Sequence, residues 1–176
     1  EIGSLSSRKL IEEEAKHSSA VLVLEPSARG GTLKTWRKGV GSFTFTIKGR
    51  ASHAGADYEK GVSAIKEAAH QILRLHDMTD LQEGTTVNVG VVRGGTRPNV
   101  VAETAVLEVD LRVKTMLAAE RVVPAILGTQ PIDPSATICV EGGLNRPPME
   151  RTEGNLRLFR LAQEIGRKMG IELEES

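Results

Sequence analysis

Two carboxylates lie near the start of the chain, and the second of them follows a predicted strand. Glu25 directly follows the apolar run at residues 20–24, a short continuous run that predicts a buried strand. The C-terminal end of a strand in an α/β sheet is where such sheets bind substrates and metal ions. Glu1 lies 24 residues earlier. A carboxylate in the position of Glu25 needs a partner, although by residue type alone each of the two is more often a solvated surface charge.

Three other polar side chains have the chemistry of a catalytic or binding site. His53 follows a predicted strand and is flanked by Ala54 and Gly55, whose small size leaves room for a ligand beside the imidazole. Asn99 lies in a hairpin connection, and Arg112 lies on the polar side of its strand. A guanidinium group binds a carboxylate through two parallel hydrogen bonds. Simpler interpretations remain for all three: an exposed loop histidine, a turn residue and a charge on a sheet surface.

The composition excludes two classes of partner. The chain has 176 residues with 23 basic and 23 acidic side chains, so its formal net charge is zero. A protein that binds nucleic acid or an anionic membrane surface needs a positive field, which this balance does not provide. The longest apolar runs, at residues 20–24 and 87–92, are far shorter than the roughly 20 residues that cross a bilayer. We therefore expect neither nucleic acid nor a membrane among its partners.

A single cysteine, Cys139, excludes an intramolecular disulfide. It lies in an apolar run that predicts a strand, where a thiol behaves as a small apolar side chain. One cysteine is typical of a reducing compartment and favours a cytoplasmic location. The chain begins at Glu1 without an initiator methionine, so we expect the natural N-terminus to lie before it, which leaves the location open.

The elements that must position these residues follow from the periodicity of apolar side chains. Strands are predicted where apolar and polar residues alternate, and helices where apolar residues recur every three to four positions. The predicted order βαββαβ is the ferredoxin-like arrangement, an α+β fold with a four-stranded antiparallel sheet and two helices on one face. Strands are predicted at residues 42–48, 85–93, 104–114 and 136–141, and helices at residues 61–77 and 117–127.

The same periodicity predicts which side chains form the core. The strand at residues 104–114 alternates most clearly, with apolar residues on one face and charged residues on the other. The second helix is expected to bend, or to begin late, at Pro124. The other apolar faces are predicted to be Phe43, Phe45 and Ile47 on the first strand, Ile65, Ala68, Ala69, Ile72 and Leu75 on the first helix, and Val87, Val89 and Val91 on the second strand.

Both ends of the chain are predicted to be pieces of one α/β domain. Residues 6–16 predict a helix and residues 20–24 a strand. Residues 152–169 predict a helix that Gly170 ends, followed by the start of a strand at residues 171–174. Neither end could bury its apolar side chains alone. The predicted domains are an α/β fragment at residues 1–38, the inserted ferredoxin-like domain at residues 39–145, and a return segment into the α/β domain at residues 146–176.

Five short motifs, in order along the chain, carry a family resemblance. They are Glu-Ile-Gly-Ser at residues 1–4, Leu-Glu-Pro-Ser at 24–27, Gly-Arg-Ala-Ser-His-Ala-Gly at 49–55, Gly-Gly-Thr-Arg-Pro-Asn-Val-Val at 94–101 and Val-Asp-Leu-Arg at 109–112. The sequence resembles the co-catalytic zinc exopeptidases, and most of all the glutamate carboxypeptidases of the carboxypeptidase G type. Relatives in the same family are aminoacylase, acetylornithine deacetylase and succinyl-diaminopimelate desuccinylase. The resemblance covers the whole chain in register.

The resemblance implies a role for each candidate residue. Glu1 matches a ligand of one zinc ion and Glu25 a ligand of the other, so the implied cofactor is a pair of zinc ions. His53 matches a histidine of the dimerisation or lid domain that reaches into the partner subunit's site and polarises the scissile carbonyl. Asn99 and Arg112 match lid residues that hold the terminal carboxylate of the substrate. The implied assembly is a homodimer through the lid domain, and the implied substrate is a peptide or an N-acyl amino acid.

The implied activity is hydrolysis of the amide bond to a C-terminal amino acid by a zinc-bound hydroxide. The family's general base, first histidine ligand, bridging aspartate and last histidine ligand have no match in this sequence. We therefore expect the chain to be the central part of a longer enzyme and to be inactive by itself.

Two alternatives remain open. The parent enzyme could be an N-acyl-amino-acid deacylase of the same family. The chain could also be a stand-alone ferredoxin-like module for dimerisation or for binding a small molecule, in which Glu1 and Glu25 are solvated charges.

Overall fold

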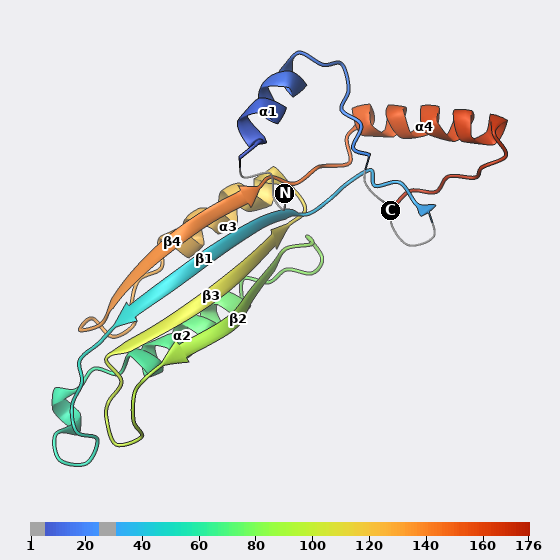
Figure 1. The fold of residues 1–176 in the computed structure, drawn as a ribbon. Helices are drawn as coiled ribbons and strands as arrows, with labels where there is room; N and C mark the ends of the chain where they lie inside the picture. Colours follow the sequence, from blue (N-terminus) through green and yellow to red (C-terminus); the bar gives the residue numbers. More distant parts are fainter. Residues whose placement is uncertain (1–5, 25–30) are drawn as a thin grey trace. The chain divides into compact units, whose positions relative to one another are not determined.

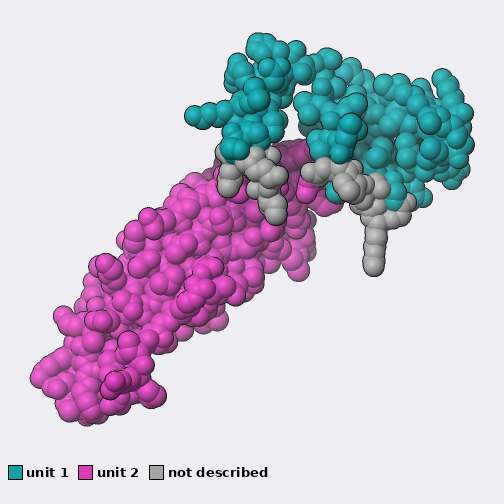
Figure 2. All heavy atoms as spheres, viewed as in Figure 1, with its two compact units in different colours: residues 1–35, 152–176 teal, residues 36–151 magenta. Residues whose placement is uncertain are grey.

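The computed structural model describes residues 6–24 and 31–176. The chain forms two compact units (Figure 2). Residues 1–35 and 152–176 make up the first unit, and residues 36–151 make up the second.

The second unit is a four-stranded antiparallel sheet with two helices on one face (Figure 1). Its elements in chain order are β1 (Gly39–Lys48), α2 (Ala64–His76), β2 (Thr86–Gly94), β3 (Thr104–Val113), α3 (Met116–Leu127) and β4 (Thr137–Arg146). The strand order across the sheet is β2-β3-β1-β4, and all three pairings are antiparallel. The predicted ferredoxin-like α+β fold is therefore confirmed.

The core lies between the sheet and the two helices. Phe45 of β1 pairs with Leu107 of β3, and both side chains are fully buried. Burying side chains of this size contributes roughly 1.5–3 kcal/mol each. The alternation predicted for the two central strands is confirmed. Their core residues are Phe43, Phe45, Ile47, Ala105, Leu107, Val109, Leu111 and Val113.

The buried face of α2 differs from the predicted one. Ile65 and Ala69, which were predicted to face the core, are exposed. Glu67 and Gln71 are buried instead, and Gln71 Nε2 donates a hydrogen bond to Glu67 Oε1 at 2.6 Å. Apolar periodicity misses this face because two of its positions are polar residues that are joined by this hydrogen bond. The buried residues of α2 are Ala64, Glu67, Ala68, Gln71 and Leu75.

A β-bulge in β2 changes the face on which one of its valines lies. Val89 pairs with Val109, but Val91 pairs with Glu108, so two steps along β2 match one step along β3. Val91 therefore lies on the polar face of the sheet, and its predicted place on the core face with Val87 is wrong. The alternation rule holds only for a regular strand, and the mark of the bulge in the sequence is Gly90, which lies between the two valines.

α3 begins at Met116 and contains Pro124, so the predicted late start is wrong. Thr115 caps the helix by accepting a hydrogen bond from Ala118 N at 3.2 Å. Pro124 is exposed. The carbonyl of Glu120, which loses its donor to the proline, can therefore bind water.

The first unit contains α1 (Arg8–Lys16) and α4 (Glu153–Lys168). Gly170 follows α4 with a φ of 73°, the left-handed conformation that glycine favours after a helix. Residues 20–24 form no strand and are exposed, so the predicted buried strand is wrong for this structure. A buried strand needs neighbouring strands, and no strand in the described part of the chain pairs with these residues.

The C-terminal residues make a short parallel pairing instead of the strand predicted at residues 171–174. Leu33 N donates to Glu174 O at 2.8 Å, and Ser176 N donates to Leu33 O at 2.9 Å. The pairing is an isolated bridge between Leu33 and Glu175. Of the helices that the structure describes, none has the length and apolar character needed to cross a membrane.

Candidate functional site

Two loops at one end of the sheet bring His53 and Asn99 together. The loop after β1 and the loop before β3 are joined by an antiparallel bridge between His53 and Val100. Next to this bridge, Ala54 N donates a hydrogen bond to Asn99 O at 3.0 Å. The Asn99 side chain is exposed, and its amide makes no hydrogen bond to any residue that the structure describes. Two predicted site residues that are far apart in the sequence thus lie side by side.

Two glycines allow the chain to pack closely around His53. A Cβ on Gly49 would lie 2.0 Å from the carbonyl oxygen of Val62, and a Cβ on Gly61 would lie 2.4 Å from Ser52 Oγ. The Val62 carbonyl belongs to the backbone and cannot move aside, so position 49 requires glycine. At position 61 the Ser52 hydroxyl can rotate, but Val101 Cγ1, 2.9 Å from such a Cβ, still makes the site tight. The two glycines lie on either side, in the sequence, of the segment with His53, Ala54 and Gly55.

The His53 ring is exposed and is held through one of its two nitrogens. The backbone N–H groups of Gly55 and Ala56 both donate to Nδ1, each at 3.1 Å. Nε2 makes no hydrogen bond to a residue in the described ranges. The same loop lines a surface cavity of ≈ 450 Å³, whose walls are Arg50, Ala51, Ser52, His53, Asp57 and Lys60.

Arg112 lies at the opposite end of the sheet. It pairs with Thr86 at the beginning of β2, whereas the loop that carries Asn99 enters β3 at Thr104. At about 3.4 Å per residue, the length of β3 between Thr104 and Arg112 is about 27 Å. A single subunit therefore does not bring Arg112 together with His53 and Asn99.

The Arg112 guanidinium is held by the carboxylate two residues before it. Arg112 Nε donates to Asp110 Oδ1 at 2.8 Å, and Nη2 donates to Oδ2 at 2.9 Å. Both side chains are 43% exposed. This ion pair is the simpler interpretation that the sequence allowed, but it does not use all five donors of the guanidinium. Nη1 has no partner among the described residues and can bind a second carboxylate.

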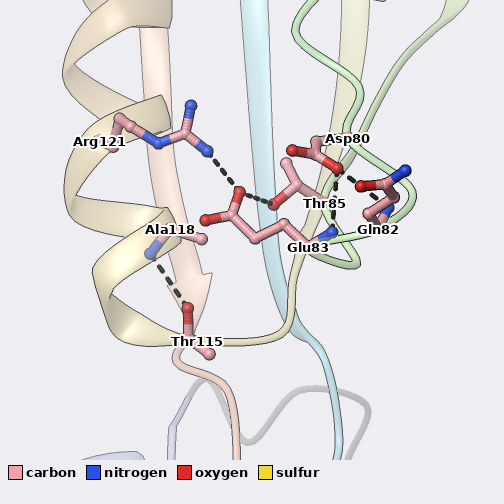
Figure 3. A network of polar contacts seen from close by, with 7 residues as sticks. All are labelled: Asp80, Gln82, Glu83, Thr85, Thr115, Ala118 and Arg121. Carbon is pink, nitrogen blue, oxygen red and sulfur yellow. Dashed lines mark hydrogen bonds and ion pairs between the residues drawn. The ribbon is translucent and has the colours of Figure 1, made fainter.

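A network of polar contacts fixes the end of the sheet that carries Arg112 (Figure 3). Asp80 Oδ1 accepts hydrogen bonds from Gln82 N and Glu83 N, both at 2.9 Å, within the turn before β2. The Glu83 carboxylate then reaches to α3 and pairs with Arg121 (Figure 3). The turn before β2 is thereby tied to the helix that follows β3.

A buried carboxylate, which apolar periodicity alone does not mark, ties α2 to the loop between α3 and β4. Glu67 is 2% exposed, and it accepts hydrogen bonds from Asp133 N and Ile132 N at 3.0 Å, besides that from Gln71. Burial alone would raise the pKa of Glu67, but these hydrogen bonds and the charge of His70 hold that pKa below its ordinary value. The signal in the sequence is the spacing of Glu67 and Gln71, one helical turn apart.

The two predicted metal ligands, Glu1 and Glu25, lie outside the described residues. Within residues 6–24 and 31–176, no group of three or more histidine, cysteine, aspartate or glutamate side chains could hold a metal ion. The described residues therefore do not by themselves form a metal centre.

A family model described as a peptidase dimerisation domain matches residues 35–127, which is more than half of the chain. The chain belongs to the M20 peptidase family. The resemblance deduced from the five motifs is therefore confirmed. The part of this M20 chain that the model covers runs from before β1 to the end of α3 and contains His53, Asn99 and Arg112.

Individual relatives agree with this assignment. Carboxypeptidase G2 of Pseudomonas sp. (strain RS-16) is 31% identical over 98% of this chain and 43% of its own length. One of the subunits of the p-aminobenzoyl-glutamate hydrolase from Escherichia coli (strain K12) is 45% identical over 40% of this chain and 16% of its own. The YxeP protein of Bacillus subtilis, a dinuclear metal-binding peptidase from the M20 family, shares the fold with a TM-score of 0.62 at 18% identity, over 98% of this chain and 46% of that one. This M20 chain thus spans less than half the length of these relatives.

Proposed function

We propose that the full-length protein containing this M20 chain is a metal-dependent carboxypeptidase or amidohydrolase that cleaves the amide bond to a C-terminal amino acid. The observation that carries this proposal is that the loops of His53 and Asn99 are joined, by the bridge from His53 to Val100 and the hydrogen bond from Ala54 N to Asn99 O, at one end of a peptidase dimerisation domain. Zinc is the metal we propose, with Glu1 and Glu25 among its ligands. Such metal ions supply the nucleophile for amide hydrolysis.

The names of the relatives favour an acidic amino acid as the leaving group. One is a carboxypeptidase, and another is a hydrolase of p-aminobenzoyl-glutamate. The first substrate to test is therefore an N-acyl-glutamate. The full-length enzyme with zinc should release glutamate from it, and it should act far more slowly on the matching glutamate α-amide. If neither compound is hydrolysed, the proposed activity is wrong. If both are hydrolysed at the same rate, the proposed recognition of the terminal carboxylate is wrong.

The roles that we propose for the three lid residues follow from the chemical groups of their side chains. His53 donates a hydrogen bond to the scissile carbonyl oxygen, and the exposed amide of Asn99 binds the substrate beside it. Arg112 binds the terminal carboxylate through the edge of the guanidinium that Asp110 leaves open. This division of labour requires a second subunit, because about 27 Å of strand separates Arg112 from the other two residues.

A two-fold dimer through a sheet edge would remove that separation. When two copies of an edge strand pair antiparallel about a two-fold axis, each end of one sheet lies beside the opposite end of the other. The Arg112 end of one subunit would then neighbour the His53 and Asn99 end of its partner. We propose that the edge used is β2 together with α2, because Leu73 on α2 and Val92 on β2 are apolar and more than half exposed.

Charge placed on this surface should break the dimer. We expect the 176-residue chain to sediment as a dimer at micromolar concentration, and Leu73→Asp to raise its dissociation constant at least tenfold, about 1.4 kcal/mol. Leu117→Asp is the matched control, because Leu117 is similarly exposed but lies on α3. A wild-type chain that stays monomeric, or a dimer that only Leu117→Asp disrupts, would contradict the proposed surface.

Replacing Arg112 by lysine in the full-length enzyme tests its role in binding the substrate carboxylate. Lysine keeps the charge but loses the planar fork, so we expect KM to rise about tenfold with little change in kcat. Arg93→Lys is the control, since Arg93 forms a comparable sheet-surface ion pair with Glu108 at 2.5 Å. Equal effects of the two substitutions would show that Arg112 serves only the surface of the sheet.

A further inference from the structure

The His53 ring meets the backbone in a way that decides which of its nitrogens carries the proton. Two backbone N–H groups, from Gly55 and Ala56, converge on Nδ1 at 3.1 Å. A backbone N–H can only donate a hydrogen bond, so Nδ1 must be the acceptor in both contacts. In a neutral imidazole with Nδ1 as acceptor, the proton lies on Nε2.

We propose that the backbone amides of Gly55 and Ala56 are positioning groups that hold His53 as the neutral Nε2–H tautomer. The ring then presents an N–H donor, and not a lone pair, to whatever approaches it. This inference about the tautomer rests on the two contacts at Nδ1 and does not depend on the proposed catalytic role of the histidine.

The loop that supplies the two amides is itself anchored at two points. Asp57 N donates to His53 O at 3.0 Å, which closes the loop on the C-terminal side. Ala54 N donates to Asn99 O, which joins the loop to its neighbour. The two N–H groups are therefore held in place before a ligand arrives, and so is the direction in which Nε2 points.

The chemical consequence, which rests on the proposed function, is a choice between two roles. A ring held as Nε2–H can donate to a carbonyl oxygen and stabilise the negative charge that develops there. The same ring cannot remove a proton through Nε2, because that nitrogen has no free lone pair in this tautomer. His53 should therefore act as a hydrogen-bond donor and not as a general base.

The tautomer can be measured directly on the 176-residue chain. Long-range ¹⁵N–¹H correlation spectra should be recorded at about pH 8, where histidine is ordinarily neutral. A His53→Gln variant identifies the signals of this ring. We expect the pattern of an Nε2–H imidazole. A predominant Nδ1–H pattern, or the averaged pattern of a ring that exchanges freely between tautomers, would overturn the proposal.

Two variants separate the amides from the rest of the loop. Ala56→Pro removes one of the two N–H donors and should raise the Nδ1–H fraction at least severalfold. Gly55→Ala keeps its N–H, and its added methyl would make only ordinary contacts with the ring, at 3.5–3.6 Å, so the tautomer should not change. An unchanged tautomer in a folded Ala56→Pro would also overturn the proposal, and should that variant not fold, the wild-type spectrum alone decides.

Kinetics of the full-length enzyme test the tautomer of His53 and its proposed catalytic role separately. There, Ala56→Pro should lower kcat with little effect on KM. If the wild-type ring is the Nε2–H tautomer but His53→Ala, which has no donor, leaves turnover intact, the positioning inference holds, whereas the proposed catalytic role of His53 fails.

Discussion

Replacing His53 by alanine in the full-length enzyme should lower kcat by about 10²–10³-fold and change KM much less. A donor to the carbonyl oxygen binds more strongly as negative charge develops, so its loss is felt mainly in the transition state. His53→Gln is the matched comparison, because an amide N–H can replace part of the hydrogen bond. Steady-state kinetics on an N-acyl-glutamate measure both parameters. A rise in KM alone would assign His53 to substrate binding.

Mixing subunits tests whether His53 acts across the dimer. His53→Ala subunits should be combined with subunits disabled at Glu25, each inactive by itself. Every heterodimer would then hold one site with intact metal ligands and a wild-type histidine from the other subunit, so part of the activity should return. If heterodimers form and no activity returns, His53 acts within its own subunit or not at all.

Replacing Glu67 by glutamine should lower the free energy of unfolding by about 2–4 kcal/mol. The carboxylate accepts hydrogen bonds from two backbone N–H groups and from Gln71. The side-chain NH₂ of a glutamine at this buried position would face one or more of these N–H donors and could not accept a hydrogen bond from them. Urea unfolding measures the change. Glu120→Gln, at an exposed position on α3, should change stability by less than about 0.5 kcal/mol. Equal effects would mean that the buried carboxylate is not what ties α2 to the loop.

The same carboxylate should make stability depend on pH in acid. The pKa of Glu67 in the folded state lies below the ordinary value of 4.5, so the charged form is the one that folding favours. Its contribution is fully present above the unfolded-state pKa and is lost as the pH falls through the folded-state pKa. The stability difference between wild type and Glu67→Gln should therefore be constant near neutral pH and shrink below about pH 4.5. A difference that persists undiminished to about pH 3 would contradict this assignment.

The alternation of β1 and β3 was readable from the sequence because it is a local property. Apolar residues at every second position leave only one face to bury, and the structure buries that face from Phe43 to Ile47 and from Ala105 to Val113. The order of strands and helices then selects the ferredoxin-like topology. The segment around His53 was also readable, since the close approach of Gly49 to the Val62 carbonyl requires glycine.

The tertiary structure alone decided the features that depend on partners distant in the sequence. The buried face of α2 contains Glu67 because backbone N–H groups from the loop before β4 come to meet it. The bulge that turns Val91 over is set by pairing with β3. The meeting of His53 with Asn99, and their separation from Arg112, follow from strand register. Periodicity reports which side of an element is apolar, whereas register and loop pairing are set by non-local hydrogen bonds, which leave no periodic trace in the sequence.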